Sequence, residues 1–136
     1  MESNKIIELY NQLELIQRQI QSVESQLDEI VKQKEQVKTS VKALKDLSEE
    51  KSEEVLVPIV NGVFAKAKLL DTKKLLVSVG SNVLVSKSID EAVKLLEDNV
   101  KELETYQGQL EATYKQLIAE FNRIQDQLSK LSGANN

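Results

Sequence analysis

The sequence predicts an α+β fold: a long antiparallel coiled-coil hairpin with two central β-hairpins that oligomerise with other chains. Apolar residues recur at alternating steps of three and four along residues 1–47 and again along 89–132, as in left-handed coiled coils. Between these segments, residues 55–87 contain short β-branched runs separated by turn residues. A chain of 136 residues has room for one domain, so we expect residues 1–136 to form one domain with three segments.

The first helix has twelve seam positions, and eleven of them are apolar. They are Ile6, Leu9, Leu13, Ile16, Ile20, Val23, Leu27, Ile30, Lys34, Val37, Val41 and Leu44. No Gly or Pro interrupts them. An ordinary bundle helix has a wider apolar stripe, so a strict seam of this length favours a coiled coil.

The central segment predicts four strands in two consecutive hairpins. The strands are Val55–Val60, Val63–Leu70, Lys73–Val79 and Val83–Lys87, and the turns are Asn61-Gly62, Asp71-Thr72 and Gly80-Ser81-Asn82. Asn-Gly between apolar runs is a strong hairpin signal, because both residues tolerate positive φ. Pro58 has no N–H to donate, which predicts a sheet edge or a bulge at that point of the first strand.

These strands are apolar on both faces, and four short strands cannot cover two faces by themselves. Their open edges also invite pairing with other chains. We therefore expect oligomerisation through the strands. The residues expected to carry it are Val57, Ile59, Val63, Phe64, Leu75, Val77, Val79, Val83 and Val85.

The second helix begins at a capping box, with Ser88 as the cap and Glu91 three residues later. Its twelve seam positions are again apolar with one exception, Gln107. They are Val93, Leu96, Val100, Leu103, Gln107, Leu110, Tyr114, Leu117, Phe121, Ile124, Leu128 and Leu131. This pattern predicts a second coil helix over residues 89–132.

Antiparallel pairing of the two seams within one chain matches all twelve layers, because facing residue numbers then add up to 137. Lys34 faces Leu103 and Gln107 faces Ile30, so the two polar residues fall in adjacent layers within reach of each other. Such a polar pair can fix the register of a coil. The alternative is that Lys34 extends its ammonium group to water.

The composition excludes most enzyme classes. Without His or Cys the chain lacks the usual zinc ligands and the Cys–His and Ser–His–Asp nucleophile systems, and its four glycines form no phosphate-binding loop. We expect no catalytic residue, metal site or cofactor. Residues 1–54 and 89–136 each carry a net charge of −4, which argues against nucleic-acid binding. No apolar run is long enough for a membrane span, and the lack of Cys suits the reducing cytoplasm.

The centre of the chain resembles the alpha class of the prefoldin family, which has two hairpins between its coil helices. The matching residues are Val57-Pro58-Ile59, Phe64, Lys66-Ala67, Leu69, Asp71, Lys74–Gly80, Val85, Lys87-Ser88, Asp90–Ala92, Leu96-Glu97 and Glu102-Leu103. Three positions differ from the family pattern: Val60 and Asn82 stand where the family has Gly, and Ser86 replaces an acidic residue.

This resemblance implies an ATP-independent holding chaperone. In the family, two alpha-class and four beta-class subunits form a hexamer, and their hairpins build a double β-barrel platform. The resemblance further implies that the coil tips grip non-native client proteins and pass them to a group II chaperonin.

Client binding at the coil tips also has a physical basis. The last layers of a coil lack neighbours on one side, so they are expected to fray and expose apolar side chains. The expected client-binding residues are Ile6, Ile7, Leu9, Tyr10, Leu13, Ile124, Leu128 and Leu131. The alternative is that these seam residues stay packed to the end of the coil.

Two other functions compete with a chaperone. A coiled-coil scaffold or tether would oligomerise through the hairpins but hold no clients. A transcript-cleavage-type polymerase factor also has an antiparallel coil, but its acidic working tip is the turn between the helices, and here strands occupy that place.

Overall fold

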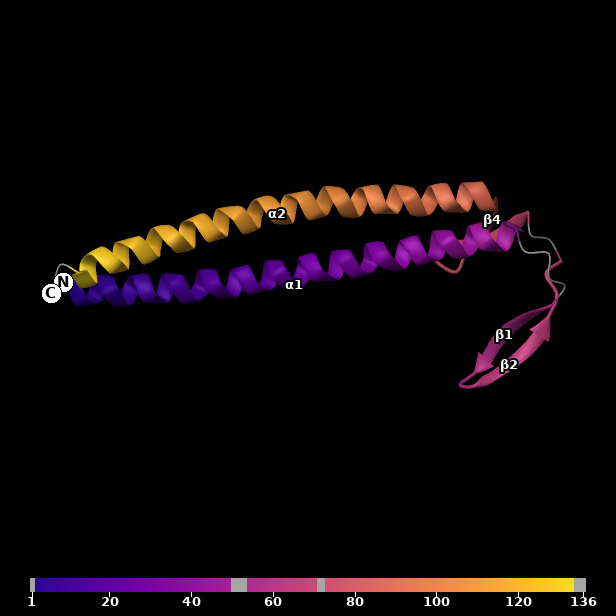
Figure 1. Ribbon diagram of the computed structural model, residues 1–136, viewed down its shortest axis with the longest axis horizontal. Coiled ribbons are helices and arrows are strands. Elements are labelled where there is room, and N and C mark those ends of the chain that lie inside the picture. Colours follow the sequence, from indigo (N-terminus) through magenta and orange to yellow (C-terminus); the bar gives the residue numbers. More distant parts are fainter. Residues whose placement is uncertain (1, 50–53, 71–72, 134–136) are drawn as a thin grey trace. The chain divides into compact units, whose positions relative to one another are not determined.

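The structure is a computed structural model that describes residues 2–49, 54–70 and 73–133. Its elements are α1 (Glu2–Glu49), β1 (Val55–Val60), β2 (Val63–Ala67), β3 (Lys74–Ser78), β4 (Leu84–Ser88) and α2 (Ile89–Gly133) (Figure 1). The predicted order of helix, two hairpins and helix is confirmed. Helix α1 continues two residues past its predicted end, since no Gly or Pro stops it there. The predicted turn at Asp71-Thr72 lies outside the described residues.

The chain divides into two units, of which the first, here the coil unit, contains residues 2–34 and 102–133. In it α1 and α2 lie side by side and antiparallel, with the start of α1 beside the end of α2 (Figure 1). All twelve predicted seam positions of α1 are buried or half-buried. Apart from Leu47, every other side chain described in α1 is exposed, so the seam is the one apolar stripe of this helix.

Two apolar clusters join the helices of the coil unit. The larger contains Leu9, Ile16, Ile20, Ile124 and Leu128, and the smaller contains Val23, Ile30 and Leu110. Leu9 and Leu128, whose numbers add up to 137, share the larger cluster, which confirms the predicted antiparallel pairing. Burying each large apolar side chain contributes roughly 1.5–3 kcal/mol, so these clusters hold the coil together.

The second unit, here the hairpin unit, covers residues 35–101 and contains two separate two-stranded antiparallel sheets, β1–β2 and β3–β4. In β1–β2, Pro58 pairs with Phe64 and Val60 pairs with Val63, so the intervening Ile59 has no partner. This irregularity confirms the bulge that Pro58 predicted. In the Asn-Gly turn only Gly62 has positive φ, at 75°, so the turn is not the form in which both central residues are left-handed.

The β3–β4 turn has three consecutive residues with positive φ: Gly80 at 105°, Ser81 at 51° and Asn82 at 61°. Two hydrogen bonds close it: the Val79 N–H donates to the Val83 carbonyl oxygen at 3.0 Å, and the Val83 N–H donates to the Gly80 carbonyl oxygen at 2.9 Å. Asn82 thus adopts the left-handed conformation that its place in the turn requires. Asn is, after Gly, among the residues that tolerate it best.

The capping box at the start of α2 is present with both of its hydrogen bonds. The Glu91 N–H donates to the Ser88 hydroxyl oxygen and the Ser88 N–H donates to the Glu91 carboxylate, each at 3.1 Å. The hydrogen bonds from the Ser88 backbone and then from its side chain lower the pKa of Glu91 below its ordinary value. Beyond the cap, the buried Ile89 and Ala92 begin the packed face of α2.

The cap makes the stability of this helix start depend on pH. Because the pKa of Glu91 is lower in the folded than in the unfolded chain, its carboxylate stabilises the fold above the unfolded pKa. That contribution is lost as the pH falls through the folded pKa. We expect Ser88→Ala, which removes the side-chain hydrogen bond but keeps the backbone one, to raise the pKa of Glu91 part of the way toward its ordinary value in an NMR titration, while Ser86→Ala, on the same strand, leaves it unchanged. An unchanged Glu91 pKa in Ser88→Ala would contradict this account.

Candidate functional site

The coil end, defined as the eight residues predicted to bind clients, is mostly packed. Leu9, Ile124 and Leu128 are buried, with Ile124 only 1% exposed, and the other three seam residues are half-buried. Those three are Ile6, Leu13 and Leu131. The exposure expected from fraying is therefore not seen, because each apolar residue has a counterpart on the other helix up to the last layers. These six side chains therefore match the alternative, in which the seam residues stay packed to the end of the coil.

Ile7 and Tyr10 differ from the rest of the coil end, since each is 58% exposed. They lie three residues apart on α1, on adjacent turns and outside the seam. Large apolar side chains with this spacing form a small surface that is accessible without any opening of the coil.

A groove of about 490 Å³ lies beside Tyr10, between the two helices. Its lining comes from both helices: Tyr10, Leu13, Gln125, Asp126, Leu128, Ser129 and Ser132. The groove joins apolar side chains to amide, hydroxyl and carboxylate groups, so it can accept an apolar side chain and hydrogen-bond the peptide around it. Sequence reasoning missed its polar members, because polar residues flank every coiled-coil seam and carry no distinguishing signal.

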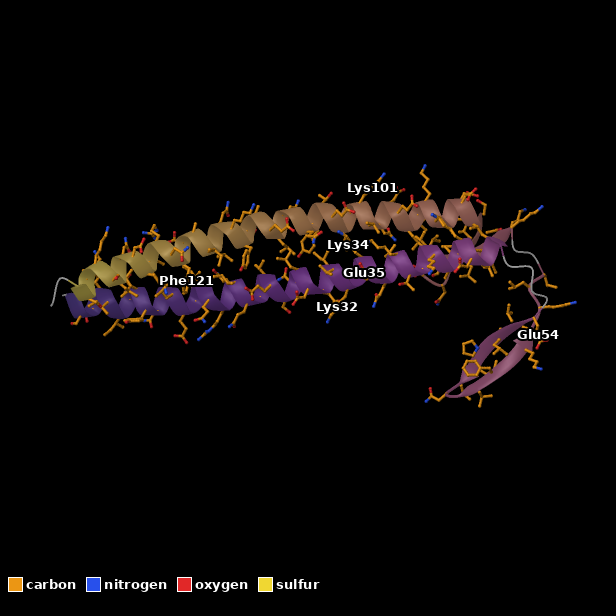
Figure 2. The ribbon with its side chains drawn as sticks, in the orientation of Figure 1. Lys32, Lys34, Glu35, Glu54, Lys101 and Phe121 are labelled. Carbon is orange, nitrogen blue, oxygen red and sulfur yellow. The ribbon has the colours of Figure 1, made fainter. Side chains whose placement is uncertain are left out.

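The two polar seam residues meet in the coil unit. Lys34 Nζ donates to Gln107 Oε1 at 3.2 Å, and both side chains are half-buried. Figure 2 shows Lys34 between the two helices. The prediction that these residues lie within reach of each other is confirmed.

Two tyrosines also link the helices by hydrogen bonds. The Tyr106 hydroxyl donates to Gln26 Oε1 at 3.1 Å, and the Tyr114 hydroxyl donates to Glu24 Oε1 at 3.3 Å. The seam pattern predicted where Tyr114 packs, but a hydroxyl partner on the other helix depends on the rotation of both helices and was not foreseen.

The hairpin surface, defined as the nine residues predicted to oligomerise, is open. Two of the nine, Val79 and Val83, were predicted as strand residues but lie in the turn between β3 and β4. Leu75 and Val77 are half-buried, and the other seven side chains are exposed. Four strand residues that the prediction did not name are also exposed: Leu56, Val60, Leu76 and Leu84. Leu76 is 70% exposed. Their signal was present in the sequence, because in β1, β3 and β4 they alternate with the named residues and make the second face apolar as well.

The described part of the chain offers little for chemistry. Over residues 2–49, 54–70 and 73–133, no cluster of three or more acidic, His or Cys side chains is arranged to hold a metal ion. Among the helices described there, none has the length and apolar character needed to cross a membrane. The features that stand out are two apolar surfaces, one at the coil end and one on the hairpins.

The family model described as "Prefoldin subunit" matches residues 16–134. The prefoldin alpha subunit of Pyrococcus horikoshii is 37% identical over 99 residues, which are 71% of this chain and 67% of that protein. The subunit of Methanococcus aeolicus is 34% identical over 93 residues, which are 65% of this chain and 63% of the relative. The subunit of Thermofilum pendens is 40% identical over 84 residues, which are 61% of this chain and 60% of that relative. The chain thus matches less than two thirds of the length of the last two relatives.

A solved structure has the same fold. The cryo-EM structure of filamentous PFD from Methanocaldococcus jannaschii aligns with a TM-score of 0.76 at 25% sequence identity. The alignment covers 85% of this chain and 96% of that chain.

Proposed function

This chain belongs to the prefoldin family, and we propose that it is an alpha-class subunit of an ATP-independent chaperone that holds non-native proteins. The alpha class is supported by the relatives, which are alpha subunits, and by the two hairpins between the helices. We propose no catalytic activity for it.

The observation that carries the proposal is the exposed hairpin surface. Both faces of the strands carry large apolar side chains that one chain leaves uncovered, and an apolar surface of this kind marks an interaction site. We propose that beta-class prefoldin subunits cover it by strand pairing, in the double-barrel arrangement that the family resemblance implies. The free strand edges of the two hairpins supply the hydrogen-bonding groups for such pairing.

For client binding we propose the exposed pair Ile7 and Tyr10 together with the adjacent groove. They present apolar surface and hydrogen-bonding groups side by side, which suits an unfolded segment of no fixed sequence. The packed seam residues of the coil end join the site if the last turns open. Several coils in one assembly then act on one client together, so that weak contacts add up to firm holding.

Transfer of the client to a group II chaperonin and a cytoplasmic location complete the proposal. The transfer rests on the family resemblance. The location is supported by the absence of cysteine, which suits a reducing compartment.

A scaffold is the second candidate function. It is favoured by one observation, the match to a structure of filamentous PFD, because a filament needs no client site. The two functions differ in what the coil end does. A scaffold assembles through its hairpins but leaves the aggregation of an unfolded client unchanged.

The first test concerns assembly. We expect Ile59→Lys with Phe64→Lys to weaken association with a beta-class subunit by roughly 100-fold, because two large apolar side chains lose their burial. Both side chains are exposed in the single chain, so helical circular dichroism should persist. The control, Gln17→Lys with Gln21→Lys, adds the same charge on the exposed face of α1 and should assemble normally. Undiminished association of the Ile59 and Phe64 variant would show that β1 and β2 are not the interface.

The second test concerns client holding. We expect Ile7→Ser with Tyr10→Ser to assemble normally but to suppress aggregation of an unfolded client about tenfold less well, because the apolar contact is lost. The effect should be the same with and without ATP. The control, Leu15→Ser with Val31→Ser, removes two exposed aliphatic side chains from the same unit outside the coil end. If both variants hold the client equally well, the client site lies elsewhere.

A further inference from the structure

Lys34 and Gln107 are the only polar residues among the 24 predicted seam positions, and they bond to each other. Their side chains are half-buried, unlike the charged pairs on the outer faces of the helices, such as Glu14 with Arg18. A partly buried hydrogen bond depends on geometry, because a donor or acceptor that loses its partner there is also poorly hydrated.

The apolar seam alone discriminates poorly between registers. When one helix slides along the other by one heptad, apolar seam positions again meet apolar positions, at the cost of an overhang at the ends. The polar residues behave differently. Lys34 comes to lie opposite Leu110 when the slide goes one way, and Gln107 opposite Val23 when it goes the other way. The slide that brings Gln107 opposite Val23 also brings Lys34 opposite Leu96, three layers away, and so breaks the Lys34–Gln107 hydrogen bond. The opposite slide keeps the two residues in adjacent layers, so the hydrogen bond discriminates against the first slide only.

Parallel pairing of two copies is disfavoured by the same residue. In a parallel, in-register coil each residue faces its own equivalent, so two Lys34 ammonium groups would face each other within the seam. Like charges in such a position repel, which is a common way of excluding a competing arrangement.

We propose that the Lys34–Gln107 hydrogen bond holds the register of the coil against the slide that brings Gln107 opposite Val23, and that Lys34 selects pairing within one chain over parallel pairing between chains. This role is independent of the proposed chaperone function, since it concerns only how α1 and α2 find each other. It accounts for two polar residues in a seam where aliphatic residues would pack with more stability.

The test uses cysteine pairs, because the natural chain has no cysteine. The native register is reported by Ile20→Cys with Leu117→Cys, whose parent residues pack in one cluster. A register slipped by one heptad is reported by Ile20→Cys with Leu110→Cys. Each pair is placed in the wild-type background and in Lys34→Leu with Gln107→Leu, and the rates of disulfide formation within and between chains are measured.

In the double-leucine background we expect the ratio of native to slipped crosslinking to fall about three- to tenfold, the population change that one hydrogen bond of ordinary strength corresponds to. Crosslinks between chains should increase as well. The melting temperature should stay equal or rise, because apolar side chains replace a polar pair. A lower crosslinking ratio together with an equal or higher melting temperature then shows that the coil has lost its register and not its stability.

Two further variants sharpen the result. Lys34→Gln keeps an N–H donor for Gln107 Oε1 and should keep most of the native ratio. Lys32→Leu removes a lysine two residues away that projects from α1 on the side opposite α2 (Figure 2), and it should keep the wild-type ratio. An unchanged ratio in the double-leucine variant would overturn the proposal. So would loss of its helical circular dichroism, because an apolar seam should fold.

Discussion

The apolar side chains that one chain can bury lie in the helices, and this constraint governs the rest of the molecule. Among the described residues, every fully buried apolar side chain belongs to α1 or α2 and none belongs to a strand. The seam brings the start of α1 to the end of α2 and leaves its own side chains buried or half-buried in both helices. The strands, which are just as apolar, remain uncovered and require a partner.

This division separates the two proposed activities of the chain. The hairpins supply an assembly surface of β-branched and aromatic side chains, whereas the coil end supplies a small apolar surface beside a groove with polar walls. For the proposed client binding, the coil end needs both a stable seam and exposed apolar side chains. Its seam residues provide the stability, and two residues outside the seam, Ile7 and Tyr10, provide the exposed apolar area. A client site that leaves the seam intact can act repeatedly without unfolding its own support.

Much of the fold could be predicted from the sequence because its determinants are local. The seam follows from the spacing of apolar residues, the start of α2 from Ser88 and Glu91, and the bulge from Pro58. The proximity of Lys34 and Gln107 could be predicted once the two seams were aligned in antiparallel order. These features depend on periodicity, capping and backbone chemistry, which a single sequence displays directly.

The candidate site was less predictable. Ile124 and its neighbours are packed in this structure, and this could not be predicted, since periodicity shows which face packs but not how completely the last layers close. The groove beside Tyr10 and the tyrosine hydrogen bonds depend on the rotation of one helix against the other. The second apolar face of the hairpins was predicted from the alternation of the strands, yet its residues, such as Leu76, were not included among those expected to carry oligomerisation.

The central claim is that the hairpins are an incomplete surface that a different subunit completes. Sedimentation velocity of this chain alone, of a beta-class prefoldin subunit alone and of their mixture tests it most directly. The account predicts a single species in the mixture that is heavier than either component and contains both. If the two proteins sediment independently over the whole concentration range, with this chain remaining a monomer, the hairpin surface is not an assembly site and the account is contradicted.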